Sequence, residues 1–251
     1  MPRILILEGN TPDLPGAAGF FVATLTALDP TLVPEIANPY TAQPHFEGVD
    51  AVILTGAGVA WSACAPEAEP QRLALTHAIE AGLPIWGSCN GLHLATTLLG
   101  GTLRASPNGI EAGLARDIRI TEAGQGHPMM NGRSPGYAAP CIHRDEVATL
   151  PGGATLLSGN AHSAVQACAI TEGAATLWLT QYHPECAPAD IAAFLRAGGI
   201  FAPHAGLIPL LEAEEASALG LPAEALDLRQ RACELAAWLD FVQSRTAPRA
   251  A

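Results

Sequence analysis

The sequence predicts an α/β fold, an open and mostly parallel twisted sheet with helices on both faces, because apolar strands alternate with amphipathic helices over the first 200 residues. The strand-like runs 3–7 and 51–55 are almost continuously apolar, which is typical of parallel strands buried on both faces. Helix-like runs separate them, as the crossovers between parallel strands require. The chain has 251 residues, 49% of them hydrophobic, and can bury a core of ordinary size.

The N-terminal half is predicted to alternate strand and helix. After the first strand, residues 15–28 form a helix. A second, amphipathic helix over residues 70–81 ends at Gly82, in the position where glycine commonly terminates helices. The short apolar strand 84–86 follows, and after a glycine-containing turn the apolar run 92–99 predicts another helix.

The following segment adds strands without long helices between them. Residues 115–121 alternate in polarity, as an exposed or edge strand does. Further short strands are expected at residues 155–157, 164–170 and 176–182. This run of strands predicts an antiparallel extension of the sheet, followed by a helix at residues 187–197.

The remainder is predicted to be a helical C-terminal extension, residues 201–251, packed on the same domain as residues 1–200. It is rich in Ala, Leu and Glu, and helices are expected at 207–219 and 223–245, with Pro222 at the start of the second. The extension is too short for a further catalytic domain.

The amino-acid composition excludes several classes of function for this protein. The net charge of −12 disfavours nucleic acid as a partner. All 12 basic residues are arginine, so a P-loop or Schiff-base lysine is excluded. No apolar run is long enough to span a membrane, and the N-terminus is too short for a signal peptide, so a cytoplasmic protein is expected. The six scattered cysteines form no CxxC pair, and no His, Asp and Glu set has metal-ligand spacing, so we expect neither metal nor cofactor.

A cysteine stands on the turn between strand 84–86 and helix 92–99, in the motif Gly87-Ser88-Cys89-Asn90-Gly91. A nucleophile on such a turn projects above the carboxyl end of the sheet, and the following helix favours its thiolate. The alternative is a buried structural cysteine beside glycines that serve packing.

A second motif, His183-Pro184-Glu185, lies at the predicted end of strand 176–182. Residues two apart on a strand face the same way, so His183 and Glu185 could project to one side. Glu185 would then orient His183, which would take the proton from Cys89. The alternative is a turn with a solvated glutamate.

Together the two motifs resemble the class I glutamine amidotransferases, whose nucleophile lies in a G-x-C-x-G elbow and whose triad ends in H-P-E. The segments 51–58, 100–121 and 142–158 also resemble the family, and the likeness covers residues 1–195. It is nearest to stand-alone domains like the glutaminase part of GMP synthase. The resemblance implies a flavodoxin-like amidotransferase fold and release of ammonia from glutamine through a Cys89 thioester.

The resemblance also implies roles for individual residues. It implies a catalytic triad of Cys89, His183 and Glu185. It implies an oxyanion hole formed by the backbone N–H groups of Asn90 and of Ala57 or Gly58. It also implies that a small-molecule substrate is contacted by His93, His143 and Gln166. Ammonia would pass to a separate synthetase subunit, or the chain would act alone.

The sequence departs from the family pattern at His93, at Asn90, where the family commonly has leucine, and in the glycine loop 55–58; the first departure bears on the substrate. His93 stands where the family usually has a glutamine that grips the substrate. His93, near the mouth of the site, could donate a hydrogen bond as glutamine would, or suit another γ-glutamyl amide. It could also mark a catalytically silent binding or regulatory relative. A reactive, low-pKa thiol at Cys89 would separate the enzyme from the silent relative.

Overall fold

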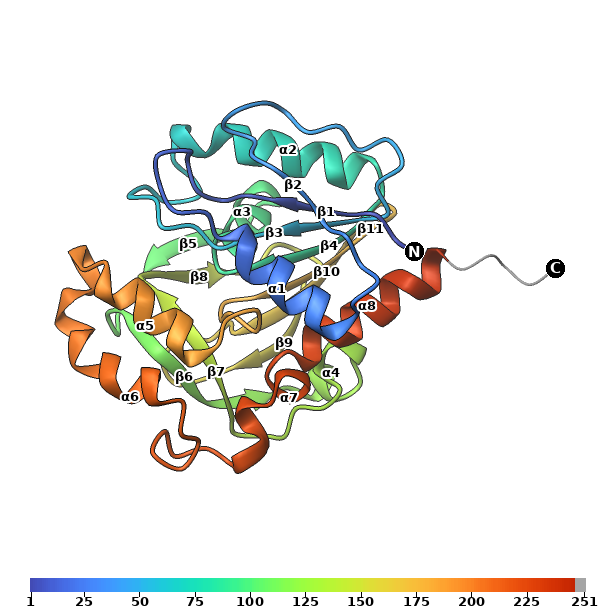
Figure 1. Cartoon of the computed structure of the whole chain (residues 1–251). Coiled ribbons are helices and arrows are strands. Elements are labelled where there is room, and N and C mark those ends of the chain that lie inside the picture. Colours follow the sequence, from blue (N-terminus) through green and yellow to red (C-terminus); the bar gives the residue numbers. More distant parts are fainter. Residues whose placement is uncertain (247–251) are drawn as a thin grey trace.

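The computed structural model describes residues 1–246, and a nine-stranded mixed sheet forms its centre (Figure 1). The parallel half runs in the order β2 (Glu35–Ala37), β1 (Ile4–Leu7), β3 (Ala51–Leu54), β4 (Pro84–Ser88) and β11 (Ala175–Thr180). The antiparallel half continues with β10 (Ala167–Glu172), β9 (Thr155–Gly159), β6 (Glu111–Ile120) and β7 (Tyr137–His143). The predicted α/β fold with an antiparallel extension is confirmed.

Alternate residues of the parallel strands supply two separate cores. Ile6 and Ile53 pack on one face, whereas Leu7 and Leu54 pack on the other. The helices sort accordingly: α1 (Ala18–Leu28) and α8 (Cys233–Thr246) cover the first face, and α2 (Glu69–Glu80) and α3 (Asn90–Leu98) cover the second. Burial on both faces explains why these strands are continuously apolar in sequence.

The antiparallel half differs from its prediction in one respect. The segment expected as an exposed or edge strand, 115–121, belongs to β6, which lies between β9 and β7 with Ala115 and Ile118 fully buried. A bulge between Ala115 and Ile118, where Asp117 has a φ of 52°, lets both apolar side chains turn inward, and β7 forms the edge of the sheet. A second, two-stranded sheet pairs β5 (Thr102–Ala105) with β8 (Asp145–Thr149), and the short helix α4 (Glu122–Gln125) follows β6.

The C-terminal segment is helical but more broken than expected. After α5 (Pro188–Arg196), the predicted helix 207–219 is present only as α6 (Ile208–Ala213), which ends where Glu214 adopts a φ of 47°. The predicted helix 223–245 is divided into a 3-10 turn, α7 (Leu228–Arg231) and α8, with Ala232 between the last two. The final residues of the predicted extension, 247–251, lie outside the described residues.

Helix α8 completes the core rather than standing apart from it. Leu235, Trp238 and Val242 are fully buried, and the Trp238 ring lies 6.3 Å from that of Trp86 on β4. Within residues 1–246, none of the helices combines the length and the apolar character needed to cross a bilayer.

Candidate active site

Cys89 lies between the end of β4 and the start of α3, in a strained conformation. Its φ of 49° is unusual for a residue with a side chain. The backbone is held there from both sides, because Cys89 N–H donates to Thr180 O at 2.7 Å and Cys89 O accepts from His93 N–H at 3.0 Å. Cys89 thus follows the carboxyl end of β4 directly, at the position of the nucleophile in a nucleophile elbow.

The flanking glycines are required by close packing. A Cβ on Gly91 would lie 2.8 Å from both Cβ and O of Leu54 on β3. A Cβ on Gly87 would lie 2.8 Å from Cδ2 of Leu179 and 2.9 Å from the carbonyl carbon of Gly91. Neither glycine has a positive φ, so their role is to let α3 approach the sheet closely enough to form the turn.

Substitution Gly91→Ala is therefore expected to lower the free energy of unfolding by about 1–3 kcal/mol, because the new methyl group meets the backbone of β3. Urea unfolding followed by far-UV circular dichroism measures the change. Gly19→Ala on α1 is the matched control, since a Cβ added at Gly19 would have no neighbour within 4 Å. Equal stability of the two variants would contradict this packing argument.

His183 and Glu185 are brought together by a turn. The imidazole Nδ1 lies 2.7 Å from Glu185 Oε1, and both side chains are buried. Strand β11 ends at Thr180, so the expectation that strand alternation aligns the pair is wrong. Instead, residues 181–187 form neither helix nor strand, and Cys186 N–H donates to His183 O at 3.1 Å to close the turn.

The Glu185 carboxylate is anchored to the strand that carries Cys89. Its Oε2 accepts from Ser88 Oγ at 2.9 Å, and that hydroxyl accepts in turn from Trp86 Nε1 at 3.0 Å. Sequence reasoning did not identify Ser88 as a site residue, although it directly precedes the nucleophile. This chain of hydrogen bonds fixes the position of the carboxylate behind the imidazole.

Burial and charge act in opposite directions on His183. Burial favours the neutral imidazole and would lower its pKa, but the Glu185 carboxylate and the Cys89 thiol outweigh burial, so that the pKa is raised. His183 Nε2 has no hydrogen-bond partner within the described part of the chain. The raised pKa favours the imidazolium form of His183 near neutral pH.

The Cys89 sulfur also faces an amide that sequence reasoning missed. Gln181 Nε2 lies 3.7 Å from Cys89 Sγ, and Gln181 Oε1 lies 2.9 Å from His93 Nε2. Burial lowers the pKa of His93 to about 4, so the imidazole is neutral at pH 7. His93 is 7% exposed, about as buried as Cys89 at 8%, and it contacts the Gln181 amide that also faces the sulfur. The signal for Gln181 was its position two residues before His183.

The residues predicted for the oxyanion hole lie on the expected elements. Asn90 is the first residue of α3, and Ala57 and Gly58 follow β3. Gly58 N–H donates to Asn10 Oδ1 at 2.6 Å, whereas Ala57 N–H has no hydrogen-bond partner among residues 1–246. Asn10, which the motifs did not indicate, therefore positions this loop and leaves Ala57 as the free donor.

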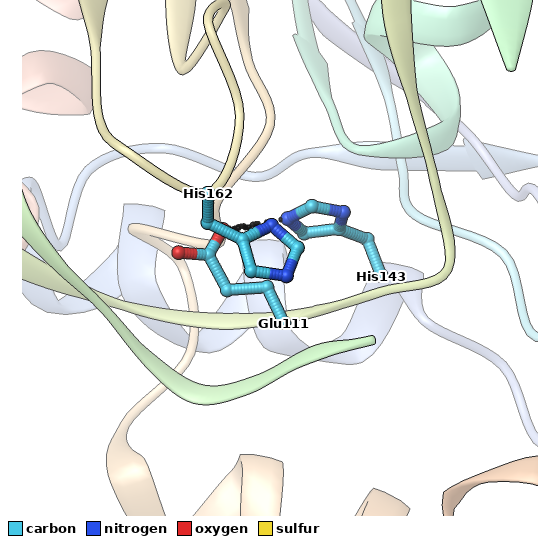
Figure 2. A group of neighbouring side chains, drawn as sticks. All are labelled: Glu111, His143 and His162. Carbon is cyan, nitrogen blue, oxygen red and sulfur yellow. Dashed lines mark hydrogen bonds and ion pairs between the residues drawn. The ribbon is translucent and has the colours of Figure 1, made fainter. Parts of the chain in front are cut away.

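His143 and Gln166, predicted to contact substrate, meet at Glu111. Glu111 Oε2 lies 2.8 Å from His143 Nε2 and 2.8 Å from Gln166 Nε2, while Glu111 Oε1 accepts from Asn160 Nδ2 at 2.7 Å. Figure 2 shows the His143 ring directed at this carboxylate with His162 beside it, 3.8 Å from Oε2 through Nδ1. Among these contacts, both nitrogens of His143 are engaged, since Nδ1 lies 3.1 Å from Asp145 O.

Two groups have the donor types of a metal site. Ligand atoms of Glu111, His143 and His162 lie within 4.8 Å of one another, a proximity that their separation in sequence concealed. The other group is His183 and Glu185 with Cys186. In both groups the carboxylate already accepts hydrogen bonds from protein side chains, so both fit an internal polar network.

The model of the family "Glutamine amidotransferase class-I" matches residues 29–196. The chain is 33% identical over 214 residues to γ-glutamyl-L-1-hydroxyisopropylamide hydrolase of a Pseudomonas species, covering 77% of this chain and 71% of the relative. It is 32% identical over 107 residues to one subunit of the glutamine-hydrolyzing GMP synthase of Methanoculleus marisnigri, covering 43% of this chain and 54% of the relative.

Solved structures show the same fold. A glutamine amidotransferase from Thermotoga maritima aligns with a TM-score of 0.63 at 16% identity, over 96% of this chain and 97% of that one. A glutamine amidotransferase from Methylobacillus flagellatus aligns with a TM-score of 0.58 at 20% identity, over 97% and 93%.

Proposed function

Since the chain belongs to the class I glutamine amidotransferase family, we propose that it hydrolyses γ-glutamyl amides through a thioester on Cys89. The observation that carries the proposal is the placement of Cys89 on a strained strand-to-helix turn whose following residues lie at a helix N-terminus. The His183–Glu185 pair at 2.7 Å supports the same chemistry.

The reaction proceeds in two steps. The Cys89 thiolate attacks the γ-carbonyl carbon, and the N–H groups of Asn90 and Ala57 stabilise the resulting oxyanion. The imidazolium of His183 protonates the leaving nitrogen as the carbon–nitrogen bond breaks, and the acyl group remains on sulfur. His183 then takes a proton from water, which attacks the thioester and releases glutamate. Glu185 keeps the imidazole oriented in both steps.

We propose that the substrate is an N-substituted γ-glutamyl amide and that the chain acts as a hydrolase without a synthetase partner. The similarity to the γ-glutamyl-L-1-hydroxyisopropylamide hydrolase extends over 77% of this chain, against 43% and 59% for two GMP synthase relatives. The replacement of a family glutamine by His93, which bonds to Gln181, also favours a substrate other than glutamine.

Glutamine is the second candidate, with ammonia passing to a separate synthetase subunit. The match to the glutamine-hydrolyzing GMP synthase supports it. In that case, His143 and Gln166 would shape the glutamine site through Glu111, without themselves contacting glutamine.

The test compares glutamate release from glutamine with that from an N-alkyl γ-glutamyl amide, using enzymatic glutamate detection. We expect a higher kcat/KM for the N-alkyl amide. Intact-mass labelling by a glutamine-like electrophile, competed by either amide, reports binding at Cys89 independently of turnover. Faster hydrolysis of glutamine would replace the first candidate by the second, and labelling that does not prefer Cys89 would overturn both.

A further inference from the structure

We propose that helices α7 and α8 clamp the loop carrying His183 and Glu185, with Arg231 and Glu234 as positioning residues. The inference rests on the proposed function, because it concerns how the catalytic pair is held. Arg231 and Glu234 lie beyond residue 196, where the match to the family ends. The positioning device is thus built from a part of the chain that the family model does not include.

The loop needs support because sheet pairing stops before it. Strand β11 ends at Thr180, and residues 181–187 form neither helix nor strand. Within this loop, Pro184 has no backbone N–H, so its carbonyl oxygen is its only backbone group that can form a hydrogen bond. That carbonyl stands between His183 and Glu185, so a shift of it moves both side chains.

Arg231 binds this carbonyl group. Its Nη1 donates to Pro184 O at 2.7 Å, from the last residue of α7. The next carbonyl along the loop, Glu185 O, accepts from Thr24 Oγ1 of α1 at 2.9 Å. Two consecutive carbonyls are therefore held by two different helices, and a charged donor makes the bond to Pro184 the stronger of the two.

Glu234 holds the residue that precedes His183. Tyr182 OH donates to Glu234 Oε1 at 2.6 Å, and both side chains are fully buried. Arg133 pairs with the same carboxylate through Nε at 2.7 Å and Nη2 at 2.9 Å, and Nη2 also donates to Arg231 O at 2.7 Å. A buried charge that loses its partner is costly, so the network fixes one arrangement of the loop relative to α7 and α8.

The same helix supports the other side of the catalytic pair. Trp238 of α8 packs against Trp86, whose Nε1 donates to Ser88, and Ser88 donates to the Glu185 carboxylate. Helix α8 lies on the same face of the sheet as α1, within one core (Figure 1). The C-terminal helices thus reach Glu185 through the loop backbone and through its carboxylate.

The test is Arg231→Ala, with Arg229→Ala as the matched control on the exposed side of the same helix. We expect Arg231→Ala to lower kcat about 10- to 100-fold, because misplacement of catalytic groups by a fraction of an ångström to one ångström has effects of this order. The KM should change by less than about twofold, since substrate binding groups are untouched. Arg231→Lys, which retains a donor, should restore part of kcat.

Alkylation of Cys89 by iodoacetamide across pH gives a readout that needs no substrate. We expect Cys89 alkylation in Arg231→Ala to shift to lower rates near neutral pH, because a displaced His183 activates the thiol less. Tyr182→Phe, which removes the bond to Glu234, should produce the same shift and keeps the test open if Arg231→Ala does not fold. Thermal unfolding of each variant gives the folded fraction.

The proposal is overturned if folded Arg231→Ala and Tyr182→Phe match Arg229→Ala in kcat and in the alkylation profile. It is also overturned if the whole loss of kcat equals the loss of folded protein. If the wild-type chain hydrolyses no γ-glutamyl amide, the proposed function fails, and the alkylation profiles still decide whether the helices position His183.

Discussion

Replacement of Cys89 by serine is expected to abolish hydrolysis of every γ-glutamyl amide that the wild-type chain accepts, with kcat falling at least about 10⁴-fold. The elbow presents one sulfur atom, faced by Gln181 Nε2 at 3.7 Å, and no other residue can take over the attack from that position. A hydroxyl has a far higher pKa than a thiol, so the imidazolium that stabilises a thiolate cannot generate the alkoxide. Glutamate release under saturating substrate measures the loss.

Cys64→Ser is the control, because Cys64 is exposed and should leave kcat unchanged. Acid quenching during turnover should also trap one glutamyl group on the wild-type protein and none on Cys89→Ser. Retention of activity in Cys89→Ser, with the circular dichroism spectrum unchanged, would remove Cys89 from the mechanism and assign the chain to a different chemistry.

The parallel half of the fold was predictable because its signal is local. The strand predicted at 51–55 is observed as Ala51–Leu54, and the helix predicted at 70–81 is observed as Glu69–Glu80. Because these strands are buried on both faces, each has a continuous run of apolar residues in the sequence. Two strands lack such runs, β7 of the antiparallel half and β8 of the second sheet: they contain charged, proline or alanine residues, and pairing partners distant in sequence create them as strands.

Tertiary contacts also explain why the C-terminal helices were predicted too long. Residues 223–245 have the composition of a single helix, but the chain breaks at Ala232 between α7 and α8. Ala232 is itself fully buried, and this break lets Arg231 reach Pro184 while Glu234 reaches Tyr182. Helix propensity carries no information about such contacts.

In the candidate site too, some residues can be predicted from the local sequence and others cannot. Cys89 and His183 lie in short motifs that their neighbours define, so the sequence can indicate them. Asn10, which binds Gly58 N–H, and Gln181, which bridges His93 and Cys89, depend on contacts between segments that only folding brings together. These supporting residues therefore carry no motif of their own.

Substitution Glu185→Gln is expected to lower kcat by about 10²- to 10⁴-fold while preserving the shape of the side chain. In the wild-type chain, burial opposes protonation of His183 and the Glu185 carboxylate overcomes it. Without that charge burial dominates, so the pKa of His183 falls and less thiolate forms at Cys89 near neutral pH. The rate of Cys89 alkylation near neutral pH should accordingly fall relative to wild type.

The same change should alter the pH dependence of stability. A raised pKa means that the folded state binds the His183 proton more tightly, so protonation stabilises the fold at low pH and this contribution disappears as pH rises through the folded-state pKa. Glu185→Gln should therefore lose stability relative to wild type mainly at acidic and neutral pH, measured by urea unfolding at several pH values. Glu146→Gln is the control, a buried carboxylate that pairs with Arg104 away from Cys89. An unchanged alkylation profile in Glu185→Gln would show that the carboxylate does not charge His183, leaving the Cys89 thiolate to the helix N-terminus and to Gln181.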